Sequence, residues 1–294
     1  MAFVTSESIS TLAVDLLSAE LSLTQTVSQV PSGDVAPPTG GETTLRVPVP
    51  REAKIQPRGA NLDYTEIDEV PVDFSIDHIY DGARVTEHQR SLDIVDFGRQ
   101  VTRNQVRAVV AGAERQLASV MNALPIDEEV TPDGSDFDNV IADANALLDE
   151  AENPMENRWL AVSPRFAARL TSPDGVTLTD FQGEVATEAL RQGILGEYRG
   201  FIVVKSPRLT GIKALAYHSS AFAFGTLTPP MIPGTIDSAV ITEEGLSVRH
   251  VFMVDPATAS TLSLLSIYAG AELVDADRVV VLGVQVENPL PDGS

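Results

Sequence analysis

The chain contains no cysteine among its 294 residues, and it has little positive charge. Without thiols it can form neither disulfides nor thiolate metal sites, so thiol redox chemistry and zinc-finger folds are excluded. Three residues are lysine against seventeen arginines, a bias that fits either a GC-rich coding genome or a salt-adapted proteome. Stability must come from packing and assembly, because the chain is long enough for a substantial core in one or two domains.

The scarcity of basic residues also limits the partners that the chain can bind. The formal net charge is −22 and the pI is near 4.4. A protein that grips nucleic acid needs clustered lysines and arginines to neutralise phosphates. The composition argues against a DNA-binding face, although a shell with an acidic inner surface could enclose DNA.

Long apolar runs are absent as well. No run approaches the ~20 residues that a membrane-spanning helix needs. The first thirty residues lack a basic residue ahead of their apolar stretch, and Asp15 and Glu20 interrupt it, which is unlike a signal peptide. We therefore expect a protein without a membrane segment that is made without export.

Residue clusters that could perform chemistry are also missing. His78 and His88 lie near acidic residues, but no metal-ligand spacing such as HExxH is present. No serine sits in a GxSxG motif, and the acidic stretch 127–139 lacks the alternating ligands of a calcium-binding loop. We expect no enzymatic activity, no cofactor and no metal ion.

What the chain does contain is a long charged hairpin that leads into a long helix, between Gly41 and Leu124. The first limb of the hairpin is basic and the returning limb is acidic. An isolated two-stranded ribbon is marginally stable in water, so the charges and sides of this arm are predicted to meet neighbouring subunits. The arm residues predicted to make such contacts are Arg46, Arg51, Lys54 and Arg58 on the first limb and Glu66, Asp68 and Glu69 on the second.

Two helices flank this arm in the sequence. Apolar residues at three- and four-residue spacing predict a helix over about 92–124, with Arg99, Arg103 and Arg107 as a basic stripe. The stripe fits either a solvated face or an acidic partner on a neighbouring subunit. A short amphipathic helix over 7–22 carries Ile9, Leu12 and Leu16, which we predict to dock on another subunit. The Pro- and Gly-rich connector 28–41 follows, without regular structure.

The second half of the chain predicts mixed α/β structure. Residues 137–151 form an amphipathic helix, RWLAVSP (158–164) a buried strand, and Ser163 caps the helix that follows. A helix over about 183–192 leads to a buried strand at 200–207. From Ala214 onward the pattern is one of strands.

This order of parts resembles the major capsid protein of tailed bacteriophages, whose Hong Kong 97 type fold is shared with encapsulin shells. Local phrases also look like those of phage capsid proteins: GETTLRVPVPR, VTEHQRSLDIVDF, RWLAVSPRFAARL, LGEYRGFIVVKSPRL and SIYAGAELVDADRVVVLGV. The resemblance covers nearly the whole chain. It implies an α+β fold with an N-terminal arm (1–40), an extended loop (41–85), a spine helix with part of the peripheral domain (86–130), an α/β axial domain (131–235), and peripheral strands with a C-terminal tail (236–294).

The resemblance also implies a function. It predicts a structural subunit that self-assembles as pentamers and hexamers into an icosahedral head around double-stranded DNA, in a virion that is assembled in the host cytoplasm. Expected partners are further copies of the chain, a separate scaffolding protein, a portal and a decoration protein, with no sequence-specific DNA binding. The alternatives are an encapsulin-type nanocompartment and, from another class, an acidic hydrolase whose site is not evident.

Overall fold

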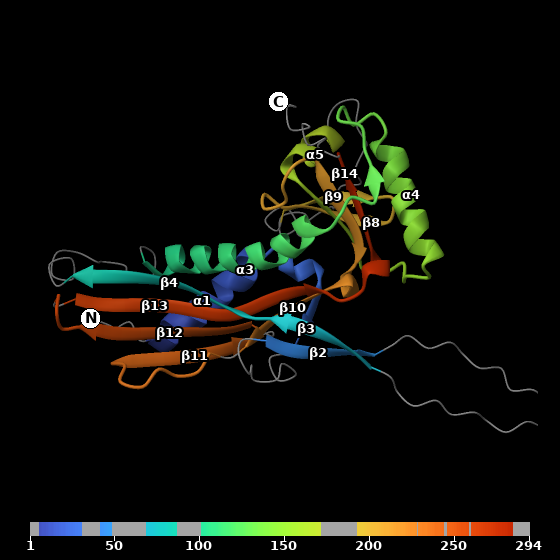
Figure 1. Ribbon diagram of the computed structural model, residues 1–294. Helices are drawn as coiled ribbons and strands as arrows, with labels where there is room; N and C mark the ends of the chain where they lie inside the picture. Colours follow the sequence, from blue (N-terminus) through green and yellow to red (C-terminus); the bar gives the residue numbers. More distant parts are fainter. Residues whose placement is uncertain are drawn as a thin grey trace, which may run out of the picture.

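The computed structural model describes residues 6–30, 42–48, 69–86, 101–171, 193–227, 229–243, 246–258 and 260–284. These residues form helices that pack on two six-stranded sheets, together with a separate two-stranded arm (Figure 1). The α+β class predicted from the sequence is confirmed. The α-helices described are α1 (Ser6–Glu20), α3 (Arg103–Ala123), α4 (Phe137–Glu150) and α5 (Pro164–Leu170).

The first sheet, which we call the long sheet, is organised around β13. One edge of β13 pairs with β4, and the other pairs with β12 and then with β10. Both α1 and α3 contact this sheet and each other. The strands of the long sheet are β1 (Ser28–Val30), β10 (Phe222–Leu227), β13 (Ser260–Leu273), β12 (Leu246–Asp255), β11 (Asp237–Glu243) and β4 (Asp77–Thr86).

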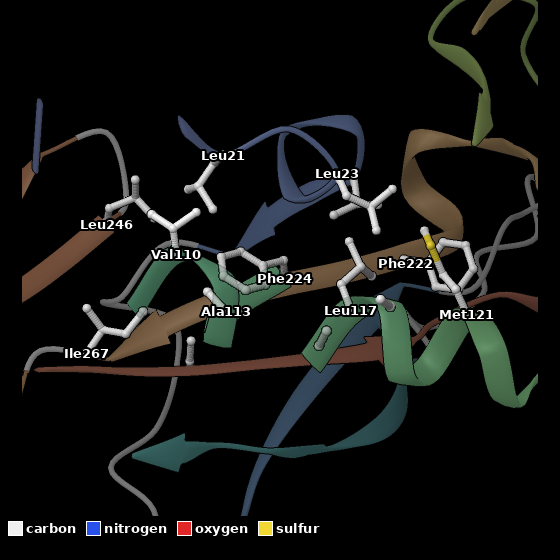
Figure 2. Packing of buried hydrophobic residues seen from close by; sticks show 14 of the residues in the cluster. Leu21, Leu23, Val110, Ala113, Leu117, Met121, Phe222, Phe224, Leu246 and Ile267 are labelled. Atoms are coloured by element: carbon white, nitrogen blue, oxygen red, sulfur yellow. The ribbon is translucent and has the colours of Figure 1, made fainter. Parts of the chain in front are cut away.

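The main hydrophobic core lies between α3 and the long sheet. Residues of α3 at three- and four-residue spacing are buried, as the sequence pattern predicts: Val106, Val109, Val110, Ala113, Leu117 and Met121. Figure 2 shows Leu117 and Met121 beside Phe222 of β10, with Leu23 of the N-terminal segment close by. The helix ends at Ala123, two residues before Pro125. The predicted helix began at about 92, and residues 87–100 lie outside the described residues.

Gly112 allows α3 to approach β4 closely. A Cβ atom at this position would lie 2.4 Å from Cγ2 of Ile79, far inside van der Waals contact. Glycine usually weakens a helix by about 1 kcal/mol relative to alanine. Here the missing side chain lets α3 lie directly on β4, the strand that follows the arm. The arm and the spine helix are therefore both joined to β4.

The second sheet, which we call the compact sheet, carries α4 and α5 and a second core. Phe137 of α4 stacks on Phe166 of α5 with ring centroids 4.0 Å apart. The predicted cap at Ser163 is confirmed, since its Oγ accepts a hydrogen bond from the backbone N–H of Phe166 (3.3 Å). The strands are β5 (Glu128–Glu129), β14 (Val279–Gly283), β9 (Lys213–His218), β6 (Arg158–Val162), β8 (Phe201–Lys205) and β7 (Ile194–Tyr198).

The chain changes sheets at different places from the predicted boundaries. β10 already belongs to the long sheet at 222–227, although the axial domain was predicted to extend to 235. After β13 the chain returns, and β14 pairs with β9 and β5 in the compact sheet. β4 belongs to the long sheet rather than to the extended loop. The boundaries differ because strand pairing between distant segments, not local composition, assigns a strand to its sheet.

The N-terminal segment also differs from the prediction. α1 confirms the expected helix, but it packs on the body of its own chain, against β11, β12 and α3. In the connector, Ser28–Val30 forms the regular strand β1, which pairs in parallel with β10. The remainder of the connector and the predicted helix at 183–192 lie outside the described residues.

A buried carboxylate ties these parts together. Glu114 of α3 is fully buried, and its Oε1 accepts hydrogen bonds from the backbone N–H groups of Ser22 (2.5 Å) and Leu23 (2.8 Å). Its Oε2 lies 2.6 Å from Nη1 of Arg208, in the loop between β8 and β9. One side chain therefore joins the N-terminal segment, the spine helix and the compact sheet.

We expect Glu114→Ala to lower the free energy of unfolding by about 3 kcal/mol or more, because two buried N–H groups and the Arg208 guanidinium lose their acceptor. Urea unfolding of the dispersed chain measures this. Glu114→Gln keeps an acceptor oxygen and should cost less. The matched control is Arg115→Ala, at the next, exposed position, expected within about 0.5 kcal/mol of the unaltered chain. Equal effects at positions 114 and 115 would contradict the assignment.

Candidate assembly surfaces

The arm consists of β2 (Glu42–Pro48) and β3 (Glu69–Ser75). The two strands pair antiparallel, from Glu42 opposite Ser75 to Pro48 opposite Glu69, and form a two-stranded sheet of their own. Their ends at positions 48 and 69 point away from the body (Figure 1). The predicted hairpin is therefore confirmed for its described part, and it presents a ribbon with two faces to the surroundings.

The antiparallel register assigns residues to these two faces. Leu45 lies opposite Val72, and Val47 lies opposite Val70. Directly opposed residues share a face, and alternate residues along a strand lie on the same face. Positions 45, 47, 70 and 72 thus form one face of the ribbon, and all four are aliphatic. A ribbon this narrow needs another surface to cover such a face.

The predicted contact residues of the arm fall partly within the described residues. Arg46 lies in β2 and Glu69 in β3. The remaining five lie outside the described residues, and their contacts stay predictions: Arg51, Lys54, Arg58, Glu66 and Asp68.

The basic stripe of the spine helix is partly described. Arg103 and Arg107 are exposed in the first turns of α3, and Arg99 lies outside the described residues. An acidic partner for the stripe on a neighbouring subunit stays a prediction.

The N-terminal helix offers a neighbour less surface than the sequence analysis expected. Ile9 is 1% exposed and buried within its own chain, and its docking on another subunit stays a prediction. The backbone N–H of Ser6 donates to Oδ2 of Asp237 (2.7 Å), which fixes the start of α1 to β11. Leu12 is 39% exposed, and Leu16 lies on the same helix. The amphipathic pattern indicates that α1 has a partner, but not which chain supplies it.

Sequence reasoning missed a buried histidine beneath α1. His250 of β12 is fully buried, with Nδ1 3.2 Å from Oγ of Ser6 and Nε2 2.8 Å from Oγ of Ser263. Gln105 of α3 extends the network by donating to the carbonyl oxygen of Ser263 (2.9 Å). Burial lowers the pKa of His250 to about 4, although the Asp237 carboxylate acts in the opposite direction. The neutral ring thus helps to hold α1 on the sheet.

A lysine was missed in the same way. Nζ of Lys213 donates to the carbonyl oxygens of Asn122 (3.0 Å) and Leu124 (2.8 Å), at the C-terminus of α3. A cation at this position satisfies orphan carbonyls and complements the helix dipole. Burial lowers the pKa of Lys213, while Asp127 opposes the shift. The sequence signal was a lone lysine at the start of an otherwise apolar strand.

Among the residues that the structure describes, no group of three or more histidines and carboxylates could hold a metal ion. No helix in the described part of the chain is long and apolar enough to cross a membrane.

Comparison with known proteins identifies the fold. No protein-family model and no curated protein matches the chain. A chain of the capsid of cyanophage P-SCSP1u is similar over 90% of this chain and 89% of its own, with a TM-score of 0.58 and 13% identity. A protein of Mycobacterium phage Che8 matches over 83% and 85% (TM-score 0.54, 20% identity). The SrpI encapsulin complex of Synechococcus elongatus matches over 90% and 88% (TM-score 0.52, 18% identity).

The chain has the Hong Kong 97 type capsid fold, which tailed-phage capsids share with encapsulins. The resemblance inferred from the sequence is confirmed for the fold.

Acid should weaken the attachment of α1 through His250. An unfolded histidine titrates near pH 6.5, whereas folded His250 stays neutral down to about pH 4. Its contribution to stability is therefore complete above about pH 6.5 and is lost as the pH falls from there towards 4, by up to about 3 kcal/mol.

Unfolding free energies of the unaltered chain and of His250→Asn, measured from pH 7 to 4.5, should converge as the pH falls. Thr11→Ala, at an exposed position of α1 without a titratable group, is the control and should keep the pH profile of the unaltered chain. Parallel profiles for the unaltered chain and His250→Asn would contradict the prediction.

Proposed function

We propose that the chain is the major capsid subunit of a tailed bacteriophage. It is a structural protein, without enzymatic activity, that assembles as pentamers and hexamers into an icosahedral head around double-stranded DNA. The observation that carries the proposal is the described part of the arm, whose strands β2 and β3 form a two-stranded sheet of their own with aliphatic residues at four positions of one face. The shell-protein fold supports the same reading.

The mechanism is mechanical and cooperative. The arm of one copy lies across an adjacent copy, where its basic limb meets acidic surface and its acidic limb meets arginines. Each exposed ion pair contributes only about 0–1 kcal/mol. Repetition of the contact around a closed shell makes the assembly stable.

The charge of the chain fits the enclosed cargo. A net charge of −22 repels phosphates, so DNA inside the head is confined without being gripped. Further partners of the proposal are a separate scaffolding protein, a portal and a decoration protein. The protein is located in the capsid of the virion, which is assembled in the host cytoplasm.

One observation favours a second candidate function. The encapsulin complex matches the chain with nearly the same TM-score as the phage proteins. An encapsulin-type shell would share the arm contacts and would differ in what it encloses. The contents of purified particles, DNA or a protein cargo, separate the two.

Negative-stain electron microscopy of the chain expressed alone, and together with its scaffolding protein, tests the proposal. We expect closed shells, tubes, or rings of five and six subunits. The triple variant Arg46→Glu, Arg51→Glu and Arg58→Glu should reduce assembly, because the limb that meets acidic surface becomes acidic itself. A monodisperse monomer under both expression conditions would count against a shell protein, and normal assembly of the triple variant would rule out the electrostatic part.

A further inference from the structure

The face of the long sheet that is turned away from the helices carries an exposed aromatic stack. Ile79 of β4 lies against Gly112 of α3, and side chains alternate along a strand, so His78 and Tyr80 point to the opposite face. The ring of His78 stacks on Tyr80, with centroids 5.2 Å apart, and on Tyr268 of β13, at 4.6 Å. Tyr80 is 63% exposed, in a chain of which only 5% is aromatic. A ring that served packing alone would be buried.

A buried arginine holds the stack in place. Arg249 of β12 is 3% exposed, and it donates from Nε to Oγ of Ser266 (3.1 Å) and from Nη1 to the carbonyl oxygen of Pro230 (2.5 Å). Its Nη2 lies 3.4 Å from Nε2 of His78. Because a guanidinium only donates, Nε2 must accept, and the proton of the neutral ring lies on Nδ1. Burial and the Arg249 charge lower the pKa of His78, which favours this neutral form. The stack is therefore preorganised.

The free side of the Tyr80 ring borders an open space. Since His78 covers one side of this ring, the other side is turned towards Gly82, the next residue on the same face of β4. Gly82 is exposed and lies opposite Leu264 of β13. A Cβ atom at Gly82 would meet Cδ1 of Leu264 at 3.8 Å, an ordinary contact. The glycine thus leaves room beside the ring, above an aliphatic floor.

An ion pair closes the far end of this space. Arg84 follows Gly82 on this face, and its Nη2 lies 3.3 Å from Oδ2 of Asp255, at the end of β12. Oγ1 of Thr258 donates to the same oxygen (2.7 Å), which lowers the pKa of Asp255 and keeps this carboxylate ionised. At about 3.3 Å per residue, Arg84 lies about 13 Å along the strand from Tyr80, enough for one hexose ring. We call this surface the Tyr80 platform, which consists of Tyr80, Gly82, Leu264, Arg84 and Asp255.

The chemistry of the Tyr80 platform fits an uncharged sugar. One face of a hexopyranose carries C–H groups, which pack against the electron-rich face of a phenol ring. Its hydroxyl groups donate and accept hydrogen bonds, and the Arg84–Asp255 pair offers fixed donors beside fixed acceptors. Polyanions are disfavoured, because a chain with a net charge of −22 repels them and the exposed arginine of the platform is already paired with a carboxylate.

We propose that the Tyr80 platform is a binding site for uncharged hexopyranose polysaccharides, with a sugar ring stacked on Tyr80 above Gly82 and its hydroxyl groups bonded to Arg84 and Asp255. The site lies within one chain, so it is independent of the proposed function. In a shell the site is repeated in every copy, and a weak affinity per site then gives firm adhesion to a polysaccharide.

Affinity electrophoresis of the dispersed chain, in native gels that contain dextran, laminarin, mannan or galactan, tests the site. We expect at least one of these neutral polysaccharides to retard the chain. Tyr80→Ala should lower the affinity about tenfold or more, whereas Tyr80→Phe keeps the ring and most of the affinity. The matched control is Ile236→Ala, which removes an equally exposed aliphatic side chain (63%) just before β11 and should leave binding unchanged.

Gly82→Val separates binding from folding. Valine suits a strand better than glycine does, and a Cβ atom at this position has ordinary contact with Leu264, so the variant should be at least as stable as the unaltered chain in urea. Its side chain fills the space beside Tyr80, so retardation by the polysaccharide should disappear. A stable Gly82→Val chain that binds as before would overturn the site.

Other outcomes also contradict the proposal. Retardation by none of the neutral polysaccharides overturns it, as does an equal loss of binding in Tyr80→Ala and Ile236→Ala, because adhesion is then not specific to the ring. Heparin and an oligothymidylate are tested in parallel. Binding of these polyanions in place of the neutral sugars would overturn the ligand class. Binding of an oligoproline peptide in place of the sugars would assign the Tyr80 platform to a proline-rich protein.

Discussion

A two-stranded ribbon has no interior, and the proposed function of this chain depends on that constraint. β2 and β3 hydrogen-bond to each other, but a pair of strands is marginally stable in water unless another surface covers it. The body of the subunit does not enclose the far end of the ribbon (Figure 1). Under the proposed function a second copy covers it, and the arm then becomes stable only when the shell assembles.

The base of the arm is joined to the body through β4 and the spine helix. Close contact at Gly112 seats the spine helix on the strand that continues from the arm. Glu114 then ties that helix to the N-terminal segment and, through Arg208, to the compact sheet. Lys213 closes the C-terminal end of the helix. These contacts fix the spine helix near its middle and at its C-terminal end.

Local rules predicted much of the fold, and distant pairings account for what they missed. Spacing of apolar residues predicted α4, and the Ser163–Pro164 pair predicted the start of α5. No local pattern could show that β10 joins the long sheet while β14 returns to the compact one. Glu114 lies on the apolar face of its helix, four residues after Val110, which was a signal of a buried charge. Its partners Ser22 and Arg208 are about ninety residues away in either direction, so only the folded chain identifies them.

The central claim is that neighbouring copies, not the chain alone, stabilise the arm. Amide hydrogen exchange of residues 42–48 and 69–75, compared between dispersed subunits and assembled particles, tests this most directly. Fast exchange in the dispersed chain and strong protection in particles, while β13 is protected in both, is the predicted result. Protection of the arm equal to that of β13 in dispersed subunits would contradict the claim.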